Sequence, residues 1–373
     1  MENNCEKYKK DISSNQILGE GVFGTVYNTP SDYVLKYSSL NLTRERKKDA
    51  AKSFNKDLLR HLNKDYDRHG ENDLVFVPRF QRCGYNKQVN MKGERFKYKP
   101  GDMFLDMALV EYVLGLFING ILDRKESTGF IRTISTSACP PIKNNAGKAG
   151  YFIGIEKADG SLKKLIVEKK VTKTNLIFIV LSIFQAIETM CKYQINHSDL
   201  HLDNILYKKR KNIPGGNGTN AQGYVKIKVN GTTFTFKTKS IKYYPRIADF
   251  GWSAKFSHPQ IINCTTLNNT SPDDGMPDYF EPKYDFVYFL YQLLWYTENT
   301  VYNEIMKPIG AWLFFNIEKN YTGARNKDKI LTTNGKSFRF NMRYFDVWFG
   351  DKTIRNLLKT EAFKRVTQNY LTN

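Results

Sequence analysis

The sequence has few cysteines, and they lack the spacings that build clusters. Five cysteines occur in 373 residues, all far apart, and Cys-x-x-Cys is absent. Small secreted domains rely on several disulfides, and zinc modules rely on closely paired ligands. The sequence therefore predicts neither a disulfide framework nor a structural zinc site, and a reducing compartment such as the cytoplasm fits it.

Long hydrophobic runs are also missing. The longest, Leu176–Phe184, is far shorter than the roughly 20 apolar residues that span a bilayer. The first residues, Met1–Asp11, are charged, which does not fit a secretion signal. We therefore expect a soluble protein without a transmembrane segment.

Acidic residues are scarce beside basic ones. Lys and Arg number 57 against 37 Asp and Glu, which gives a net charge of +20. Such a surface attracts polyanions, so nucleotides, nucleic acids, anionic membranes and acidic protein substrates are candidate partners. The alternative is that the abundance of lysine reflects codon bias alone. The hydrophobic content of 41% is enough to bury a large core in one bilobed domain or two small ones.

Hydrophobic periodicity predicts a mixture of strands and helices. Three short strands fit residues 15–37, and two more fit 128–136 and 151–155. A buried helix fits 105–122, and a long apolar helix fits 174–193.

Two basic segments interrupt these elements. Residues 41–73 are strongly charged, with a helical pattern near 50–62. Residues 208–246 begin with a basic Gly/Asn linker and continue with alternating residues on both sides of Asn230-Gly231, which is the signature of a β-hairpin. Residues 285–373 have a mostly helical pattern.

A glycine-rich segment lies between the first two predicted strands. It reads Gly19-Glu20-Gly21-Val22-Phe23-Gly24, and Val26 follows two residues later. Glycines at this spacing let backbone N–H groups approach phosphates closely. A dinucleotide-binding fold needs a helix directly after the third glycine. Here β-branched and aromatic residues continue the strand. This pattern indicates a flexible hairpin that covers the triphosphate of a bound nucleotide.

Two further residues suit a nucleotide phosphate site. Lys36 follows the last glycine by twelve residues (36 − 24) on the third strand and can reach the phosphates of a nucleotide under the hairpin. Asp249, in Asp249-Phe250-Gly251, lies on a glycine-containing turn where it can bind Mg²⁺. Each residue is a weak signal alone, and their order along the chain strengthens both.

The strongest signal is the octapeptide His197-Ser198-Asp199-Leu200-His201-Leu202-Asp203-Asn204. Its Asp199 and Asn204 lie five residues apart (204 − 199), after a long helix and before a strand-like segment. This spacing suits a carboxylate beside an acceptor hydroxyl and an amide oxygen on a metal. The competing interpretation is metal binding by His197 and His201, and it lacks a third and a fourth ligand at suitable spacing.

Together and in this order, these four elements resemble the eukaryotic-type protein kinase family, from about Ile17 to about Leu294. The resemblance implies an α+β, bilobed, protein-kinase-like fold with insertions. A small antiparallel-sheet lobe would cover 1–155, and a larger, mostly helical lobe would cover 156–373. The implied enzyme transfers the γ-phosphate of ATP, with Mg²⁺, to a protein hydroxyl, and serine or threonine is the commonest acceptor.

The resemblance also implies roles for individual residues. Asp199 is the catalytic base, Asn204 and Asp249 are Mg²⁺ ligands, and Lys36 contacts the phosphates. Asp285, which opens an apolar helix, corresponds to the family's buried aspartate that anchors the catalytic loop.

The ATP-binding set implied by the resemblance extends beyond the phosphates. Val26 and Leu206 are the apolar roof and floor for adenine, and Val34 and the 19–24 hairpin complete the set. Two segments compete for the hinge that binds adenine. They are Leu109–Gly115 and Ile155–Leu162.

Spacing decides between the two hinges. The family fold places about 40 residues between the hinge and the catalytic loop. Glu156 lies 43 residues before the catalytic aspartate (199 − 156), whereas Glu111 lies 88 before it (199 − 111). The hinge is therefore expected at 156–159, with Ile155 as gatekeeper and backbone groups of Glu156 and Ala158 facing adenine.

This choice frees Glu111 to be the glutamate that pairs with Lys36. The two are 75 residues apart (111 − 36), which implies a large basic insertion at about 41–100 in the small lobe. Two alternatives stay open. Asp57 is a rival acid on a charged helix, and Glu111 could simply belong to a core helix without pairing.

Three departures from the family pattern bear on regulation and substrate. Ser198 replaces the usual arginine before the catalytic aspartate, so we expect activity without phosphorylation of the activation loop. His201 stands at the position whose residue distinguishes Ser/Thr kinases from Tyr kinases. Histidine is typical of neither class, so the motif does not decide between a Ser/Thr and a Tyr acceptor. The Ala-Pro-Glu that normally ends the activation segment in this family is missing, and Gly275–Pro282 resembles this segment only loosely. The missing Ala-Pro-Glu, the 208–246 hairpin insertion and the Asp-Leu-His-Leu-Asp-Asn segment are together similar to kinases of large cytoplasmic DNA viruses of the iridovirus, poxvirus and mimivirus kind, which implies a viral protein of the host cytoplasm or the virion.

Two other functions share part of this pattern. A small-molecule kinase of the aminoglycoside or choline kinase type has His-x-Asp-x-x-x-x-Asn but usually lacks both the Gly-rich hairpin and Asp-Phe-Gly. A noncatalytic scaffold could contact nucleic acid or an anionic surface through its basic insertions. Such scaffolds generally lose a catalytic group, and none is missing here.

Overall fold

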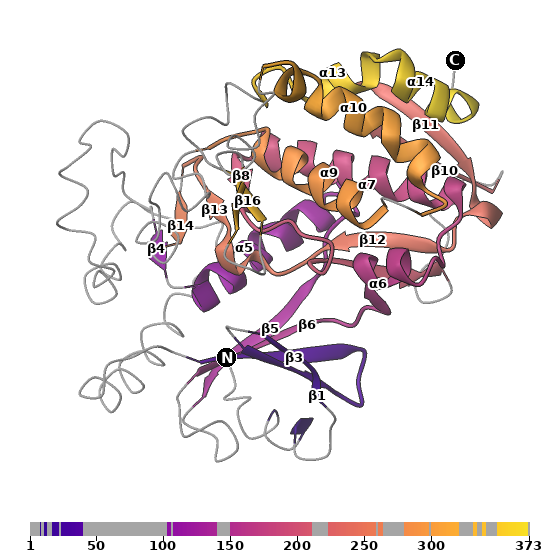
Figure 1. Cartoon of the computed structure of the whole chain (residues 1–373). Helices are drawn as coiled ribbons and strands as arrows, with labels where there is room; N and C mark the ends of the chain where they lie inside the picture. Colours follow the sequence, from indigo (N-terminus) through magenta and orange to yellow (C-terminus); the bar gives the residue numbers. More distant parts are fainter. Residues whose placement is uncertain are drawn as a thin grey trace, which may run out of the picture. The chain divides into compact units, whose positions relative to one another are not determined.

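The computed structural model describes residues 8, 11–12, 17–21, 24–39, 103–105, 107–139, 150–210, 223–258, 260–263, 280–297, 300–320, 331–333, 338–340 and 349–371 (Figure 1). These residues belong to two compact units. The first unit draws on 1–120, 131–157 and 258–264, and the second on 121–130, 158–257 and 265–373. Both units are therefore discontinuous in sequence, whereas the sequence suggested lobes that were each continuous.

The first unit is built on a five-stranded antiparallel sheet with the strand order β1-β2-β3-β6-β5. Its strands are β1 (Ile17–Gly21), β2 (Gly24–Asn28), β3 (Tyr33–Ser39), β6 (Gly150–Glu156) and β5 (Thr133–Cys139). The three strands predicted over 15–37 are confirmed. The strand predicted at 128–136 starts later, at Thr133, because Phe130 makes a bridge with Ile247 in the second unit.

One face of this sheet carries a small aromatic core. Tyr27, Leu35, Tyr37 and Phe152 are buried there and cluster with Tyr8. The rings of Tyr37 and Phe152 lie 5.0 Å apart between centroids. Because side chains alternate along a strand, the residues between these point to the opposite face.

A helix and a pair of short strands complete the first unit. The helix α5 (Met107–Asp123) confirms the buried helix predicted over 105–122, and its Val110, Leu114 and Ile118 are fully buried. The strands β4 (Met103–Leu105) and β14 (Ile261–Asn263) pair in parallel.

The second unit is organised around α7 (Lys173–Lys192). Thr172 caps the helix by accepting a hydrogen bond from the backbone N–H of Asn175. Phe184 of α7 contacts rings of α9 (Tyr284–Thr297) and α14 (Glu361–Thr367). By length and composition α7 could cross a membrane, but most of its side chains are buried inside the protein, as in the core helix of a globular domain.

Further helices and small sheets surround α7. The helices are α6 (Leu162–Val167), α10 (Asn303–Asn320) and α13 (Ile354–Lys359), with one-turn helices η4 (Thr238–Ser240), η5 (Phe250–Trp252) and η7 (Gln368–Tyr370). The strands β12 (Tyr243–Ile247), β9 (Ile205–Lys209) and β7 (Gly160–Ser161) form one sheet, and β8 (Ile195–Asn196) pairs with β13 (Ala254–Lys255). The strands β15 (Leu331–Thr333) and β16 (Phe338–Phe340) pair with each other.

The predicted hairpin is confirmed in the second unit. Strand β10 (Tyr224–Val229) pairs residue by residue with β11 (Thr232–Lys237). Asn230 and Gly231 form the turn between them, both with positive φ, 45° and 83°. This is the backbone that Asn-Gly favours, because both positions of such a turn need a left-handed conformation.

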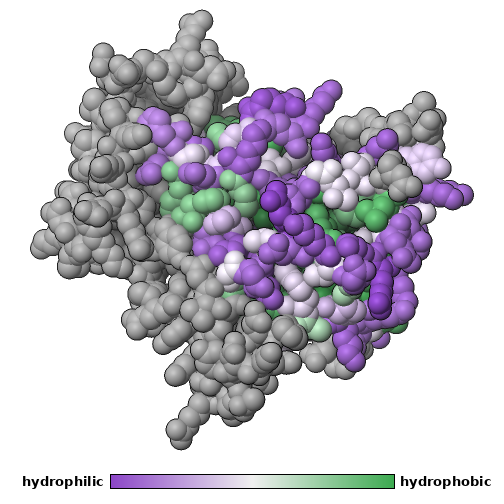
Figure 2. All heavy atoms as spheres, turned by 90° about the horizontal axis from the view of Figure 1, so that it is seen from above, coloured by the Kyte–Doolittle hydropathy of each residue, from purple (hydrophilic) through white to green (hydrophobic). Residues whose placement is uncertain are grey.

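The architecture is thus α+β, with an N-terminal antiparallel sheet followed by helices and small sheets. Hydrophilic residues make up most of the described surface seen in Figure 2, with smaller hydrophobic areas between them.

Candidate active site

In the first unit, strand register places several candidate residues on one face of the sheet. Val26 is paired with Lys36, and Lys36 is paired in turn with Ile153. Val34 is paired with Ile155 on the same two central strands. Directly paired residues share a face, so Val26, Val34, Lys36 and Ile155 lie together on the face opposite the aromatic core.

Lys36 makes an ion pair with Glu111 on this face. Its Nζ lies 3.0 Å from Oε1 and 2.8 Å from Oε2 of Glu111. Only 9% of Lys36 and 6% of Glu111 is exposed, so both charges are removed from water. The structure therefore contains the pair expected from the sequence, while the rival Asp57 lies outside the described residues.

The glycine hairpin is described in part. Glu20 and Gly21 are paired with Thr25 and Gly24 across β1 and β2, and Val22 and Phe23 lie outside the described residues. An ideal Cβ built on Gly24 would lie 2.1 Å from the carbonyl oxygen of Tyr37, whereas one on Gly19 would meet nothing within 4 Å. A glycine is thus required at position 24, because the backbone of Tyr37 approaches it too closely for a side chain. At position 19 a side chain would have room.

In the second unit, Asp285 holds the start of the 197–204 loop. Its Oδ2 accepts a hydrogen bond of 2.6 Å from the backbone N–H of His197, and its Oδ1 accepts one of 2.9 Å from that of Ser198. Ser198 has a positive φ of 65°, a conformation that these two bonds support. Asp285 lies in the first turn of α9, so the loop is anchored to a core helix.

Burial has a large effect on the Asp285 carboxyl. Removal from water raises its pKa to about 7, against the opposing effect of the two backbone N–H groups. The charged form, which can accept from both N–H groups at once, therefore requires a pH near or above 7.

His197 is fully buried and links the loop to the segment before Asp249. Its Nε2 lies 2.9 Å from the carbonyl oxygen of Ala248, and since a carbonyl only accepts, Nε2 carries the proton. Burial lowers the pKa of His197, so the ring is neutral. The ring also lies 5.0 Å from that of Phe250, between centroids.

Three candidate residues come together in this unit. The amide Nδ2 of Asn204 donates to the backbone oxygen of Asp199 at 2.9 Å and lies 3.3 Å from its Oδ2. The backbone N–H of Ala248 donates to the carbonyl of Asn204 at 2.9 Å, which brings Asp249, the next residue, beside the loop. Asp249 has a left-handed backbone (φ 62°) at the start of η5.

His201 lies next to the candidate base. Its Nε2 is 3.5 Å from Oδ2 of Asp199, and its Nδ1 accepts from the backbone N–H of Asp203 at 3.2 Å. Burial alone would lower the pKa of His201, but the carboxylates of Asp199, Asp203 and Asp249 outweigh burial and raise it. Because Nδ1 accepts from Asp203, the proton of the neutral ring lies on Nε2, which faces Asp199, and a second proton on Nδ1 would remove the hydrogen bond from Asp203.

The expected hinge residues lie at the end of β6. Ile155 is within the sheet, and Glu156 is the last residue of the strand, where its N–H donates to the carbonyl of Arg132 at 2.9 Å. The division between the two units falls after Lys157, so Ala158 begins a new stretch of the second unit. Leu206 lies on β9, half-buried and paired with Ser161. Contacts with adenine stay a prediction for all of these residues.

The donor atoms available for a metal are oxygens. Because Nδ2 of Asn204 donates to Asp199, its Oδ1 is the atom that could face a cation, together with the carboxylate of Asp249. Within the part of the chain that the structure describes, no group of three or more His, Cys, Asp or Glu could hold a metal ion. Two oxygen donors fit Mg²⁺, which commonly takes one or two protein ligands and completes its shell with phosphates and water.

Two polar arrangements around the loop have no signal in the sequence. Asn196, just before the loop, exchanges hydrogen bonds with the backbone of Glu281 at 2.8 and 3.1 Å. The partners are 85 residues apart (281 − 196), and only the fold brings them together.

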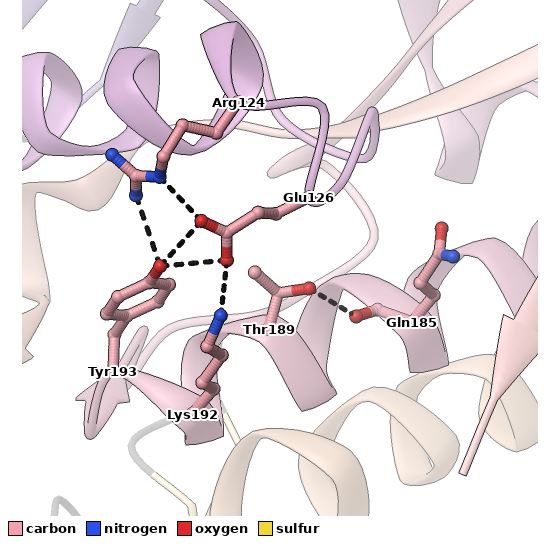
Figure 3. A network of polar contacts seen from close by, with 6 residues as sticks. All are labelled: Arg124, Glu126, Gln185, Thr189, Lys192 and Tyr193. Atoms are coloured by element: carbon pink, nitrogen blue, oxygen red, sulfur yellow. Dashed lines mark hydrogen bonds and ion pairs between the residues drawn. The ribbon is translucent and has the colours of Figure 1, made fainter. Parts of the chain in front are cut away.

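The second arrangement is a network at the end of α7 (Figure 3). Glu126 accepts from Arg124, Lys192 and Tyr193 at distances of 2.6 to 2.8 Å. These three hydrogen bonds lower the pKa of Glu126 to about 2. The network fastens the turn after α5 to the C-terminal end of α7, close to where the 197–204 loop begins.

Comparison with known proteins adds nothing to this picture. No protein family matches the sequence, and no curated protein is significantly similar to it.

Proposed function

We propose that this chain is a protein kinase that transfers the γ-phosphate of ATP to a serine or threonine hydroxyl of a protein. The observation that carries the proposal is the cluster of Asp199, Asn204 and Asp249 on two short segments joined by the Ala248–Asn204 hydrogen bond. A base, an amide oxygen and a second carboxylate at such proximity are the parts that phosphoryl transfer needs.

In this proposal Asp199 receives the proton of the acceptor hydroxyl. Its carboxylate is held by Asn204 and lies on a loop fixed at its start by Asp285. Such pre-organisation matters because phosphoryl transfer relies on positioning and on stabilising charge more than on covalent chemistry. His201, whose Nε2 lies 3.5 Å from Oδ2 of Asp199, would help to orient this carboxylate.

Oxygen atoms of Asn204 and Asp249 are the proposed Mg²⁺ ligands. When bound, Mg²⁺ would offset the negative charge of the ATP phosphates. Lys36 is proposed to contact the phosphates as well, and its ion pair with Glu111 fixes the position of the ammonium group.

The proposal includes a protein-kinase-like fold. The five-stranded sheet with α5 corresponds to the small lobe, and the unit around α7 and α9 corresponds to the large lobe. The face that carries Lys36 also carries Val26, Val34 and Ile155, which supports their assignment to the ATP-binding set.

The test is thiophosphate transfer from ATPγS to a basic and an acidic generic protein, followed by phosphoamino-acid analysis. We expect phosphoserine or phosphothreonine analogues with the unmodified chain. Asp199→Asn should lower the rate by about 10²- to 10⁴-fold, the usual contribution of a general base. Full activity of the Asp199→Asn protein would overturn the assignment.

A small-molecule acceptor is the second candidate, and one observation favours it. His201 follows Asp199 by two residues, as in many small-molecule kinases, and the structure brings its ring to the carboxylate. A parallel assay with aminoglycosides and choline separates the two. Transfer to those compounds without transfer to any protein would replace the protein kinase proposal.

A further inference from the structure

The β10–β11 hairpin has one buried face and one exposed face. Its buried side chains are Ile227, Val229, Phe234 and Phe236. They face α7, where Phe178 and Phe236 lie 5.4 Å apart between ring centroids, and Figure 1 shows the hairpin beside this helix. Gln185 of α7 also donates to the backbone oxygen of Lys228 at 3.3 Å. The apolar residues of the hairpin are therefore used for attachment to the second unit.

The opposite face is basic and polar. Lys226, Lys228 and Lys237 are exposed on it. Across the hairpin Lys226 is paired with Thr235 and Lys228 with Thr233. Three ammonium groups and two hydroxyl-bearing side chains thus share one face of the two-stranded hairpin.

The surrounding sequence does not neutralise this charge. From 205 to 248 there is no Asp or Glu, while Lys and Arg occur ten times. The ten are Lys208, Lys209, Arg210, Lys211, Lys226, Lys228, Lys237, Lys239, Lys242 and Arg246. Glu188 contacts the hairpin from α7, and its carboxylate accepts from the backbone N–H of Asn230 at 2.9 Å, on the buried side. The exposed face therefore presents a positive field to its partners.

We propose that this exposed face, formed by Lys226, Lys228, Thr233, Thr235 and Lys237, binds the phosphate backbone of a single-stranded nucleic acid without base specificity. Lysine and threonine side chains are typical donors to phosphate oxygens. Interfaces with nucleic acid are polar and strongly positive. A protein partner would need an apolar centre, and here the apolar residues already pack on α7. The chemistry of the face thus favours nucleic acid over an acidic protein.

The strand geometry supports contact with successive phosphates. Lys226 and Lys228 are two residues apart on β10, which places their Cα atoms about 6.8 Å apart along the strand. Phosphates along one nucleic acid strand repeat at about 3.4 Å of axis in stacked form, so alternate phosphates match this interval. The hairpin can therefore follow the backbone over several nucleotides.

The experiment measures binding of the full chain to a fluorescein-labelled 20-nucleotide oligothymidylate by anisotropy, without ATP and at several salt concentrations. The test variant is Lys226→Gln/Lys228→Gln/Lys237→Gln. The matched control is Lys169→Gln/Lys307→Gln/Lys359→Gln, which changes three exposed lysines of the same unit. Both variants have a net charge of +17 (20 − 3), so only the place of the charge differs.

We expect the test variant to bind roughly tenfold or more weakly than the unchanged chain, and the control to stay within about twofold. The salt slope should fall by about 2 in the test variant, since each lost phosphate contact on a single strand removes roughly 0.7. Equal weakening in both variants would mean that net charge alone acts, and the proposal would be wrong. It would also be wrong if poly-glutamate of equal charge displaced the oligonucleotide as well as unlabelled DNA does.

The measurement does not depend on the kinase proposal. Thermal melting of both variants checks that the hairpin stays folded, which we expect because the three side chains lie on the exposed face. Loss of binding with an unchanged melting temperature supports the assignment, and unchanged binding by the folded test variant overturns it.

Discussion

Asp285 accepts a 2.6 Å hydrogen bond from the backbone N–H of His197, a residue 88 positions earlier in the chain. With the second bond to Ser198, it fixes the backbone that leads into Asp199. A carboxylate can accept both bonds at once, and this makes the loop sensitive to the protonation of one buried group.

The first prediction concerns Asp285→Asn. The amide offers one oxygen where the carboxylate offers two, so one backbone N–H loses its partner. Hydrogen bonds to charged groups contribute about 1.5–3 kcal/mol, so we expect a loss of transfer activity of roughly 10- to 150-fold at pH 8. Asp351→Asn, an exposed aspartate, is the control and should leave the rate unchanged.

The same variant tests the pH dependence. Because the pKa of Asp285 is raised to about 7 from an ordinary value of 3.8, the folded protein holds this proton more tightly than the unfolded chain. Its contribution to stability is therefore full below pH 3.8 and is lost as the pH rises through about 7. Activity should follow the opposite course and rise through pH 7. If the transfer rate of the Asp285→Asn protein still rose through pH 7, the rise would not come from the ionisation of Asp285, and the proposed role of this carboxylate would be wrong.

The second prediction separates the structural from the chemical role of Lys36. Glu111→Gln removes the negative charge beside a buried ammonium, which should lower the free energy of unfolding by about 3–5 kcal/mol. Lys36→Met/Glu111→Leu removes both charges and should recover most of that stability. If Lys36 contacts ATP phosphates, the double variant stays inactive although it is stable. Urea unfolding and the thiophosphate assay measure the two properties, and an active double variant would refute the phosphate contact.

The third prediction compares two glycines of one hairpin. Gly24→Ala would place a Cβ 2.1 Å from the carbonyl oxygen of Tyr37, so β2 and β3 must move apart. We expect a loss of about 1–3 kcal/mol in unfolding free energy, as for overpacked cores. Gly19→Ala meets nothing within 4 Å and should change stability by less than about 0.5 kcal/mol. Equal effects of the two substitutions on the urea midpoint would argue against the described strand register.

The local elements of this fold were readable from the sequence because local chemistry decides them. Asn230-Gly231 predicts its own turn, since both residues tolerate positive φ. The apolar run predicts the long helix over 174–193, and in the structure the hydroxyl of Thr172 caps α7. For Glu111, spacing along the chain and the family resemblance pointed to Lys36, and the structure contains this pair.

Contacts made by the tertiary fold were not readable in this way. Asn196 meets Glu281, and Arg124 meets Tyr193, only because distant helices and turns pack together. Neither pair has a spacing rule or a motif. The same holds for the start of β5, where pairing of Phe130 with Ile247 overrides the local strand pattern.

The fourth prediction follows from Ser198, which stands where an arginine that receives a loop phosphate is usual in the resembled family. The structure uses the backbone of Ser198, whose N–H is bonded to Asp285, to order the loop. We therefore expect phosphatase-treated protein, verified by mass spectrometry, to keep its transfer rate within about twofold, because no new charge pair is needed to order the loop. Loss of activity together with loop phosphate would show that another basic residue takes the missing role.

The last prediction concerns Glu126 in the network at the end of α7. Its pKa is lowered to about 2, first by the hydrogen bond from Arg124 and then by those from Lys192 and Tyr193. Because the folded value lies below the ordinary 4.5, the stabilisation is full above pH 4.5 and is lost as the pH falls through about 2. Glu126→Gln should therefore lower the urea midpoint at pH 7, and its difference from the unchanged chain should shrink as the pH falls below 4.5.

Glu361→Gln is the matched control for this change. Glu361 pairs with Lys364 on the exposed surface of α14, where solvent screens the interaction, so its removal should shift the midpoint less than the removal of Glu126. The network differs because three donors converge on one carboxylate and join two elements that are far apart in sequence. A Glu126→Gln effect no larger than that of Glu361→Gln, or one that is constant from pH 7 to pH 3, would show that the network does not fasten the turn to α7.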